Sequence, residues 1–278
     1  MTKVPIGRIS YINVAPVYHG MDENPPPWLR MVTRPPAELN RMLEDGALVA
    51  SPVSSAAYAR NASKWLLLPD LSIASNGPVL SVLFASRVPM EELGGKEVVV
   101  TRESETSVDL LKILLAEKGV SPFYVPQKIV SPQSVPQSSK ACLVIGDAAL
   151  LHDWSRHFPY VWDLGALWKE ETGLPFVFAI WAVRKEFVCD APAMVERLVE
   201  LFWVSRQKGL KSMDRIVDAA ASKTGLKRKI LMQYFRLLEV SLGKKQQKGL
   251  QLFFDRQHEL GLIPNGVTPS FVCLSLRG

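Results

Sequence analysis

A hydroxyl-rich segment, residues 101–107, has the pattern in this chain that most clearly suggests chemistry. It follows a short apolar run at residues 98–100 and opens a helical pattern over residues 108–115. A strand, a Ser/Thr-rich turn and a helix start in succession direct free backbone N–H groups and the positive end of the helix dipole toward one place. The sequence therefore predicts an anion-binding site at this turn.

Other polar residues stand where predicted strands end. Three such pairs are Ser10-Tyr11, Ser54-Ser55 and Asn76-Gly77, and Asp147 also lies where a strand meets a helix. In open α/β sheets, ligands bind beyond the carboxyl ends of the strands. We expect these strand ends to converge. Asn13, with a proline shortly after it, is typical of a helix start.

Strand and helix patterns alternate through the first two thirds of the chain. Strands are expected at residues 6–11, 31–33, 48–53, 65–68, 79–85, 98–100, 124–125, 142–145 and 176–183. Helices are expected at residues 36–43, 56–61, 108–118 and 148–151, and then in a run that Asp190 caps, at 190–206, 213–221, 227–238 and 246–260, before a last strand at 271–276. This alternation predicts an α/β fold with mostly parallel sheets covered by helices.

Two long apolar runs, residues 79–85 and 176–183, bracket a self-contained α/β block. This arrangement is typical of one domain inserted into another. We expect a first lobe made of residues 1–84 and 180–278 and a second lobe made of residues 85–179. The cleft between two such lobes is where a ligand would bind.

The composition argues against several classes of site. The chain has 278 residues, of which 47% are hydrophobic, so it is large enough for two domains. Its three cysteines are widely spaced without a CxxC motif, and none of its four histidines is paired at ligand spacing. We expect neither disulfides nor a metal site.

The sequence also indicates where the protein is located and which partners it binds. The first seventeen residues lack the apolar core of a secretory signal, and no apolar run approaches the ~18 residues of a membrane span. We expect a cytoplasmic protein that binds neither membrane nor nucleic acid. The net charge of +6 is concentrated in lysine and arginine clusters of the C-terminal helices, which is typical of a solvated helix face.

Six blocks in order resemble one known family. They are GRISYINVAPV at 7–17, PVSSAAY at 52–58, NGPVLSVLFAS at 76–86, TSVDLLKILL at 106–115, LVIGDAAL at 143–150 and TGLPFVFAIWAV at 172–183. In these blocks the chain resembles chorismate dehydratase of the futalosine route to menaquinone. That resemblance implies a two-lobed, periplasmic-binding-protein-like type II fold. One departure is Val49, where the family usually carries an acidic residue.

The resemblance implies loss of water from chorismate to give 3-[(1-carboxyvinyl)oxy]benzoate. The ring C3 proton and the C4 hydroxyl leave, and no metal or organic cofactor is needed. Chorismate is a small dicarboxylate, so the site needs donors aimed at anions, which hydroxyl groups and helix N-termini supply. The proton acceptor could be a protein group or the enolpyruvyl carboxylate of the substrate.

The resemblance also implies roles for individual residues. Asn13 and Ser81 would be catalytic, Asn13 by polarising the leaving hydroxyl or an enolate-like carboxylate and Ser81 by assisting proton movement. The expected substrate-binding residues are Ser10, Ser54, Asn76, Gly77, Thr106, Ser107 and Asp147. Simple structural roles compete with these assignments: helix capping for Asn13, Thr106, Ser107 and Asp147, a turn for Ser54, Asn76 and Gly77, and a buried strand hydroxyl for Ser81.

Three other functions are open. The sister enzyme of the pathway, which forms a dihydroxynaphthoate, has a different N-terminal motif. A non-catalytic solute-binding protein would share the fold but would carry an export signal. A ligand-sensing regulator would normally add a helix-turn-helix. The sequence allows either a monomer or a homodimer.

Overall fold

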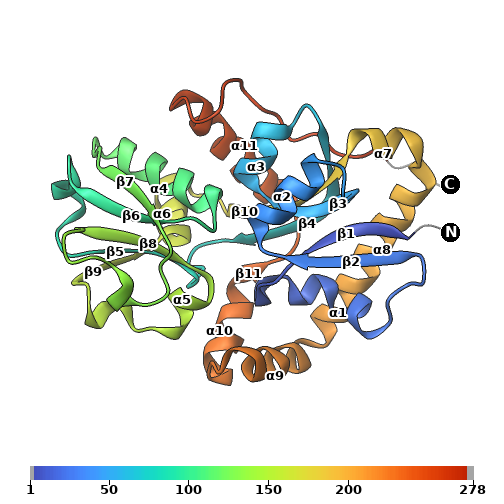
Figure 1. The fold of residues 1–278 in the computed structure, drawn as a ribbon, viewed down its shortest axis with the longest axis horizontal. Coiled ribbons are helices and arrows are strands. Elements are labelled where there is room, and N and C mark those ends of the chain that lie inside the picture. Colours follow the sequence, from blue (N-terminus) through green and yellow to red (C-terminus); the bar gives the residue numbers. More distant parts are fainter. Residues whose placement is uncertain (1–2, 274–278) are drawn as a thin grey trace.

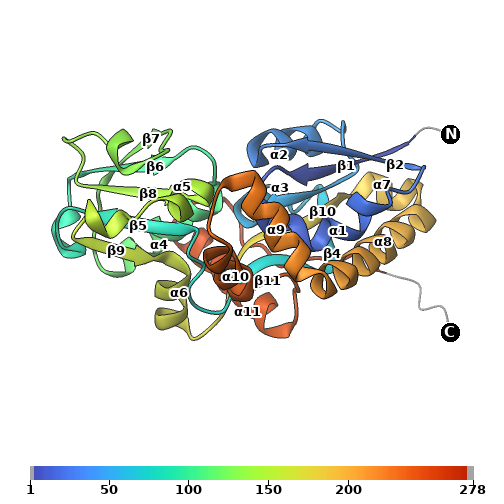
Figure 2. The ribbon, with the colours of Figure 1, turned by 90° about the horizontal axis from the view of Figure 1, so that it is seen from below.

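The computed structural model describes residues 3–273, which form two α/β lobes side by side (Figures 1 and 2). The first lobe is built on a six-stranded sheet of order β11-β4-β10-β3-β1-β2. Its strands are β1 Val4–Ile9, β2 Leu29–Arg34, β3 Ala50–Ser54, β4 Trp65–Ser75, β10 Phe176–Arg184 and β11 Leu238–Glu239.

The second lobe contains a five-stranded sheet of order β7-β6-β8-β5-β9. Its strands are β5 Val82–Ser86, β6 Glu97–Thr101, β7 Phe123–Gln127, β8 Ala141–Ile145 and β9 Tyr160–Asp163. The strands at the centre of this sheet, β6 and β8, are almost entirely apolar and buried. Strands buried on both faces read as continuous apolar runs, which explains why the sequence revealed them.

The two-lobed α/β architecture confirms the predicted fold class, but the sheets are mixed rather than mostly parallel. In the first sheet β1 pairs in parallel with β2 and β3, whereas β10 runs antiparallel to both β3 and β4. In the second sheet β5 runs antiparallel to β8 and β9. Strands β5 and β10 follow the segments that cross between lobes, and each enters its sheet in the opposite sense to its neighbours.

The helices cover both faces of the sheets (Figure 1). They are α1 Ala15–Glu23, α2 Pro36–Glu44, α3 Ser55–Asn61, α4 Glu105–Glu117, α5 Gly146–Leu151, α6 Leu164–Thr172, α7 Lys185–Asp190, α8 Pro192–Lys211, α9 Met213–Thr224, α10 Arg228–Leu237 and α11 Lys244–Glu259. The prediction that Asp190 caps a helix was wrong. Asp190 ends α7, and α8 begins at Pro192, because proline suits the first turn of a helix.

Two short segments connect the lobes. One joins β4 to β5 and the other joins α6 to β10, so β5 belongs to the second sheet from Val82 and β10 to the first sheet from Phe176. The predicted domain boundaries, 1–84 with 180–278 and 85–179, stay a prediction. Of the predicted last strand, Phe271 forms a single bridge to Leu67, and residues 274–276 lie outside the described residues.

Polar contacts also tie the lobes together beside α4. The buried carboxylate of Asp109 accepts hydrogen bonds of 2.8 Å from Arg60 of α3 and from Gln257 of α11. Arg60 donates a second bond, also 2.8 Å, to Glu105. This Asp109 network anchors the first turns of α4, which are the elements that the sequence placed at an anion site.

Along residues 3–273, no helix is both long and apolar enough to cross a lipid bilayer.

Candidate active site

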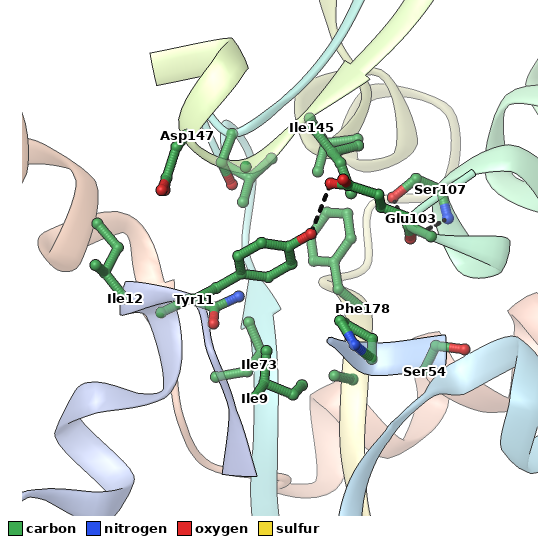
Figure 3. Close-up of a pocket in the computed structure, with 18 of the residues that line it drawn as sticks. Ile9, Tyr11, Ile12, Ser54, Ile73, Glu103, Ser107, Ile145, Asp147 and Phe178 are labelled. Carbon is green, nitrogen blue, oxygen red and sulfur yellow. Dashed lines mark hydrogen bonds between the residues drawn. The ribbon is translucent and has the colours of Figure 1, made fainter. Parts of the chain in front are cut away.

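A pocket lies where the two lobes meet and encloses about 730 Å³, counting its open side (Figure 3). Pockets for small molecules commonly have volumes of ~300–1,000 Å³. Its polar lining comes from hydroxyl, amide and carboxyl side chains: Tyr11, Asn13, Ser54, Ser81, Glu103, Ser104, Ser107, Asp147 and Tyr234. Among the described residues that line it, none is a lysine, arginine or histidine.

The start of α4 contributes two serines to this pocket. Ser104 is the N-cap residue, and its hydroxyl accepts a 3.1 Å hydrogen bond from the Ser107 N–H. The same hydroxyl donates to the Ser107 hydroxyl at 2.9 Å. A helix of thirteen residues therefore begins at the pocket wall with paired hydroxyls. This is the arrangement that favours an anion at a helix N-terminus.

Thr106 does not line the pocket, although it stands next to Ser107. Its side chain is buried, and its Oγ1 accepts a 2.9 Å hydrogen bond from the N–H of Ala56 in the first turn of α3. Thr106 thus connects the two helix starts that approach the pocket, one from each lobe. Its direct contact with substrate stays a prediction, and its observed role is structural.

Ser54 reaches the pocket at the end of β3. It is the N-cap residue of α3, and its hydroxyl accepts a 3.2 Å bond from the Ala57 N–H. Its neighbour Ser55 points away and donates to the Val177 carbonyl oxygen at 2.7 Å. Successive residues at a strand end face opposite sides, so one of the two serines is available to a ligand.

Asn13 lies in the short 3₁₀ helix Ile12–Val14 that precedes α1. Its side chain lines the pocket, and its Oδ1 atom is buried without a hydrogen-bond partner. Because burying an unpaired amide oxygen costs free energy, such an atom points to a missing donor. Asn13 is not the cap of this helix; Tyr11 occupies the position before it.

Ser81 lines the pocket but stands just before β5 rather than within a strand. The residue before it, Leu80, has a positive φ of 63°, and β5 begins at Val82. Burial raises the pKa of Tyr234, a second pocket hydroxyl, to about 12, and a hydrogen bond with Ser81 acts in the opposite direction. The two hydroxyls therefore interact at the pocket wall.

Tyr11 and Glu103 were not predicted as site residues. The Tyr11 hydroxyl donates a 2.7 Å hydrogen bond to Oε2 of Glu103, and both side chains line the pocket (Figure 3). Burial, this hydrogen bond and the nearby carboxylates raise the pKa of Tyr11. Both residues lie inside segments that the sequence singled out, whereas Tyr234 belongs to a C-terminal helix that gave no such signal.

Asp147 lines the pocket from the first turn of α5. Burial raises the pKa of its carboxyl group, Lys223 lowers it, and Glu103 raises it further. A second carboxylate, that of Glu103, also reaches the pocket.

Three predicted substrate contacts lie elsewhere. Ser10 lines a neighbouring hollow, and its carbonyl oxygen accepts a 2.7 Å bond from Lys223. Asn76 is exposed and Gly77 is buried, and neither lines the pocket. Val49, the departure from the family pattern, is also outside it, and its backbone joins Pro5 and Arg184.

Comparison with known proteins shows which family the chain belongs to. A family model described as menaquinone biosynthesis matches residues 4–259. The chain belongs to this menaquinone biosynthesis family. A chorismate dehydratase from Thermus thermophilus is 34% identical over 263 residues, covering 89% of this chain and 93% of that protein. A 1,4-dihydroxy-6-naphthoate synthase from the same organism is 25% identical, covering 91% and 92% of the two chains.

Solved structures agree with the fold. A protein from Archaeoglobus fulgidus superposes with a TM-score of 0.76 at 18% identity and covers 94% of this chain and 98% of its own. The periplasmic aliphatic sulphonate binding protein of Escherichia coli superposes with a TM-score of 0.67 at 15% identity, covering 100% and 94%. At these identities the likeness defines the fold alone. It confirms the predicted periplasmic-binding-protein-like architecture of the family member described here.

Proposed function

We propose that the chain is a chorismate dehydratase that removes water from chorismate to give 3-[(1-carboxyvinyl)oxy]benzoate. The observation that carries this proposal is the 34% identity to a protein of that name, over nearly the full length of both chains. The relative named as a naphthoate synthase is less similar, at 25%. The pocket between the lobes is the proposed substrate site.

The polar lining suits a small dicarboxylate. Ser104 and Ser107 at the start of α4, together with Ser54 at the start of α3, offer hydroxyl groups where helix dipoles are positive. Neutral donors bind a carboxylate without the cost of burying cations in a small site. We assign one substrate carboxylate to the Ser104–Ser107 pair.

The chemical step removes the ring C3 proton and the C4 hydroxyl. The buried Oδ1 of Asn13 lacks a donor, and the substrate hydroxyl is a donor of the right kind. The Asn13 Oδ1 would orient the leaving hydroxyl by accepting its hydrogen bond, and the N–H groups of the same amide would stabilise the negative charge that develops as the hydroxyl leaves. Ser81, through its interaction with Tyr234, would complete a path for the proton. Aromatisation of the ring supplies much of the driving force.

Three carboxylates compete as the base for the C3 proton. Two belong to the protein, Glu103 and Asp147, and both line the pocket. The third is the enolpyruvyl carboxylate of chorismate itself. A base with a raised pKa accepts a proton more readily near neutral pH, which favours Asp147 over an ordinary surface carboxylate.

The decisive experiment is incubation of the purified protein with chorismate and analysis of the mixture by mass spectrometry. We expect conversion to the benzoate, with the loss of one water. Tight binding of chorismate without turnover would indicate a binding protein instead. Conversion of cyclised futalosine but not chorismate would indicate the sister enzyme. The Asn13→Ala variant is the matched control for contaminating activity.

A further inference from the structure

The segment between β4 and β5 contains a residue in an unusual backbone conformation. Leu80 has φ of +63°, a left-handed conformation that is strained for a residue other than glycine. Such a residue persists only where its surroundings hold it in place. Leu80 directly precedes Ser81 of the pocket, so whatever holds Leu80 also determines where Ser81 lies.

The carboxylate of Asp163 holds this segment. Its Oδ2 accepts hydrogen bonds from the backbone N–H groups of Val79 at 2.9 Å and of Leu80 at 2.7 Å. Its Oδ1 accepts from Val79 at 3.1 Å and from two N–H groups in the first turn of α6, those of Gly165 at 2.9 Å and Ala166 at 3.1 Å. One side chain thereby joins the crossing segment to a helix start in the second lobe.

The neighbouring backbone is fitted to this contact. Gly165 lies against the crossing segment so closely that a Cβ atom there would be 2.5 Å from the Gly77 carbonyl oxygen. Ser75, at the end of β4, also donates to the Gly77 carbonyl oxygen at 2.8 Å. The path from Ser75 to Leu80 is therefore fixed at several points, and Asp163 makes the last of these contacts before Ser81.

The conformation of Leu80 separates its side chain from that of Ser81. Leu80 packs on the apolar cluster formed by Ile12 and residues of α9 and α10, whereas Ser81 faces the pocket. We propose that Asp163 is a positioning residue for the dehydration assigned above, acting through the backbone of Leu80 to hold the Ser81 hydroxyl at the substrate. This inference rests on the proposed function. Asp163 itself does not line the pocket.

The Asp163→Asn variant separates positioning from helix capping. An asparagine keeps Oδ1 as acceptor for Gly165 and Ala166 but turns an amide NH₂ toward the N–H of Leu80. We expect kcat for chorismate to fall roughly a hundredfold, as misplacement of a reacting group by about 1 Å does, with little change in KM. Amide hydrogen exchange over residues 79–82 should accelerate. Asp153→Asn, the same change at an exposed residue that precedes a 3₁₀ helix outside the pocket, is the control and should leave both measurements unaltered.

A pair of variants at Leu80 tests the same idea with Asp163 intact. Leu80→Gly and Leu80→Val both shorten the side chain, but only glycine adopts a positive φ without strain. We expect the valine variant to turn over at least about tenfold more slowly than the glycine variant. Equal kcat values for the two, or a wild-type kcat in Asp163→Asn, would overturn the proposal.

If the proposed function is wrong, the experiments give a different result from the one expected if Asp163 has no positioning role. In that case the wild-type protein would not consume chorismate at all, and the exchange rates at residues 79–82 would still report on Asp163. Unchanged exchange in Asp163→Asn would then exclude the positioning contact on its own.

Discussion

The Tyr11 hydroxyl and the Glu103 carboxylate form a 2.7 Å hydrogen bond at the pocket, joining the end of β1 in one lobe to the turn before α4 in the other. The Glu103 carboxylate thereby occupies the Tyr11 hydroxyl, a hydrogen-bond donor that a carboxylate of the substrate could use. We expect a carboxylate of the substrate to compete with Glu103 for the Tyr11 hydroxyl.

Replacing Glu103 by glutamine should strengthen chorismate binding. The variant keeps the shape of the side chain but removes a negative charge from a pocket that must accept a dianion. We expect KM to fall by up to roughly tenfold, about 1.4 kcal/mol, with kcat within about twofold of wild type. Steady-state kinetics measures both. A large fall in kcat would instead identify Glu103 as the base, and Glu105→Gln, a charge change two residues away outside the pocket, is the matched control.

Asn13→Ala should abolish most of the turnover while leaving the fold intact. Removing one preorganised polar group from a reacting centre commonly costs ~10²–10³ in kcat. The measurement is kcat together with the affinity for the benzoate product. Asn40→Ala is the control, because Asn40 also has a buried Oδ1 without a partner but does not line the pocket. A variant that binds product and turns over at the wild-type rate would remove Asn13 from the mechanism.

The stability of the protein should depend on pH through Asp147. Burial raises its pKa in the folded state, so the fold favours the protonated carboxyl group. Its contribution to stability is therefore present below the ordinary aspartate pKa of ~3.9 and is lost as pH rises through the raised value. Asp147→Asn should unfold at a higher temperature than wild type near pH 7, and the difference should shrink toward acid pH. Thermal unfolding of both proteins over a range of pH measures this difference in unfolding temperature. A difference that grows toward acid pH would contradict the raised pKa of Asp147.

Thr106→Val should destabilise the protein because it leaves the Ala56 N–H of α3 buried without its acceptor. Such a loss costs about 1–3 kcal/mol of unfolding free energy. Thr106→Ser keeps the hydroxyl and loses only a buried methyl group, so it should cost no more than about 0.8 kcal/mol. Urea unfolding of the two variants and of the wild type measures these free energies of unfolding. A valine variant as stable as wild type, with a raised KM, would restore Thr106 to the substrate-binding residues.

The helices and strands could be predicted where an apolar pattern was bounded by turn-forming residues. Strand β4 shows why the prediction failed elsewhere. The sequence suggested that it ends before Pro69 and Asp70, yet it runs from Trp65 to Ser75, with an irregular register against β10 and Asp70 at a positive φ of 54°. Tertiary contacts keep this strand continuous, since Asp70 pairs with the buried Arg206 of α8.

The candidate site shows a similar division. Asn13, Ser54, Ser81, Ser107 and Asp147 all line one pocket, whereas four other residues expected there, Ser10, Asn76, Gly77 and Thr106, do not. Adjacent residues in a helix point in directions about 100° apart, so only one of Thr106 and Ser107 faces the ligand, and the sequence does not indicate which. The partners that come from distant segments, such as Tyr234, depend on how the C-terminal helices pack and carry no local signal.

The Asp109 network has a consequence for how molecules enter and leave. A transport protein must open its two lobes widely to release its ligand. Here a wide opening would break the hydrogen bonds that the buried Asp109 carboxylate accepts from Arg60 and Gln257. We therefore expect the two lobes to stay close beside α4 while chorismate binds and its product leaves, so that turnover needs no large separation of the lobes.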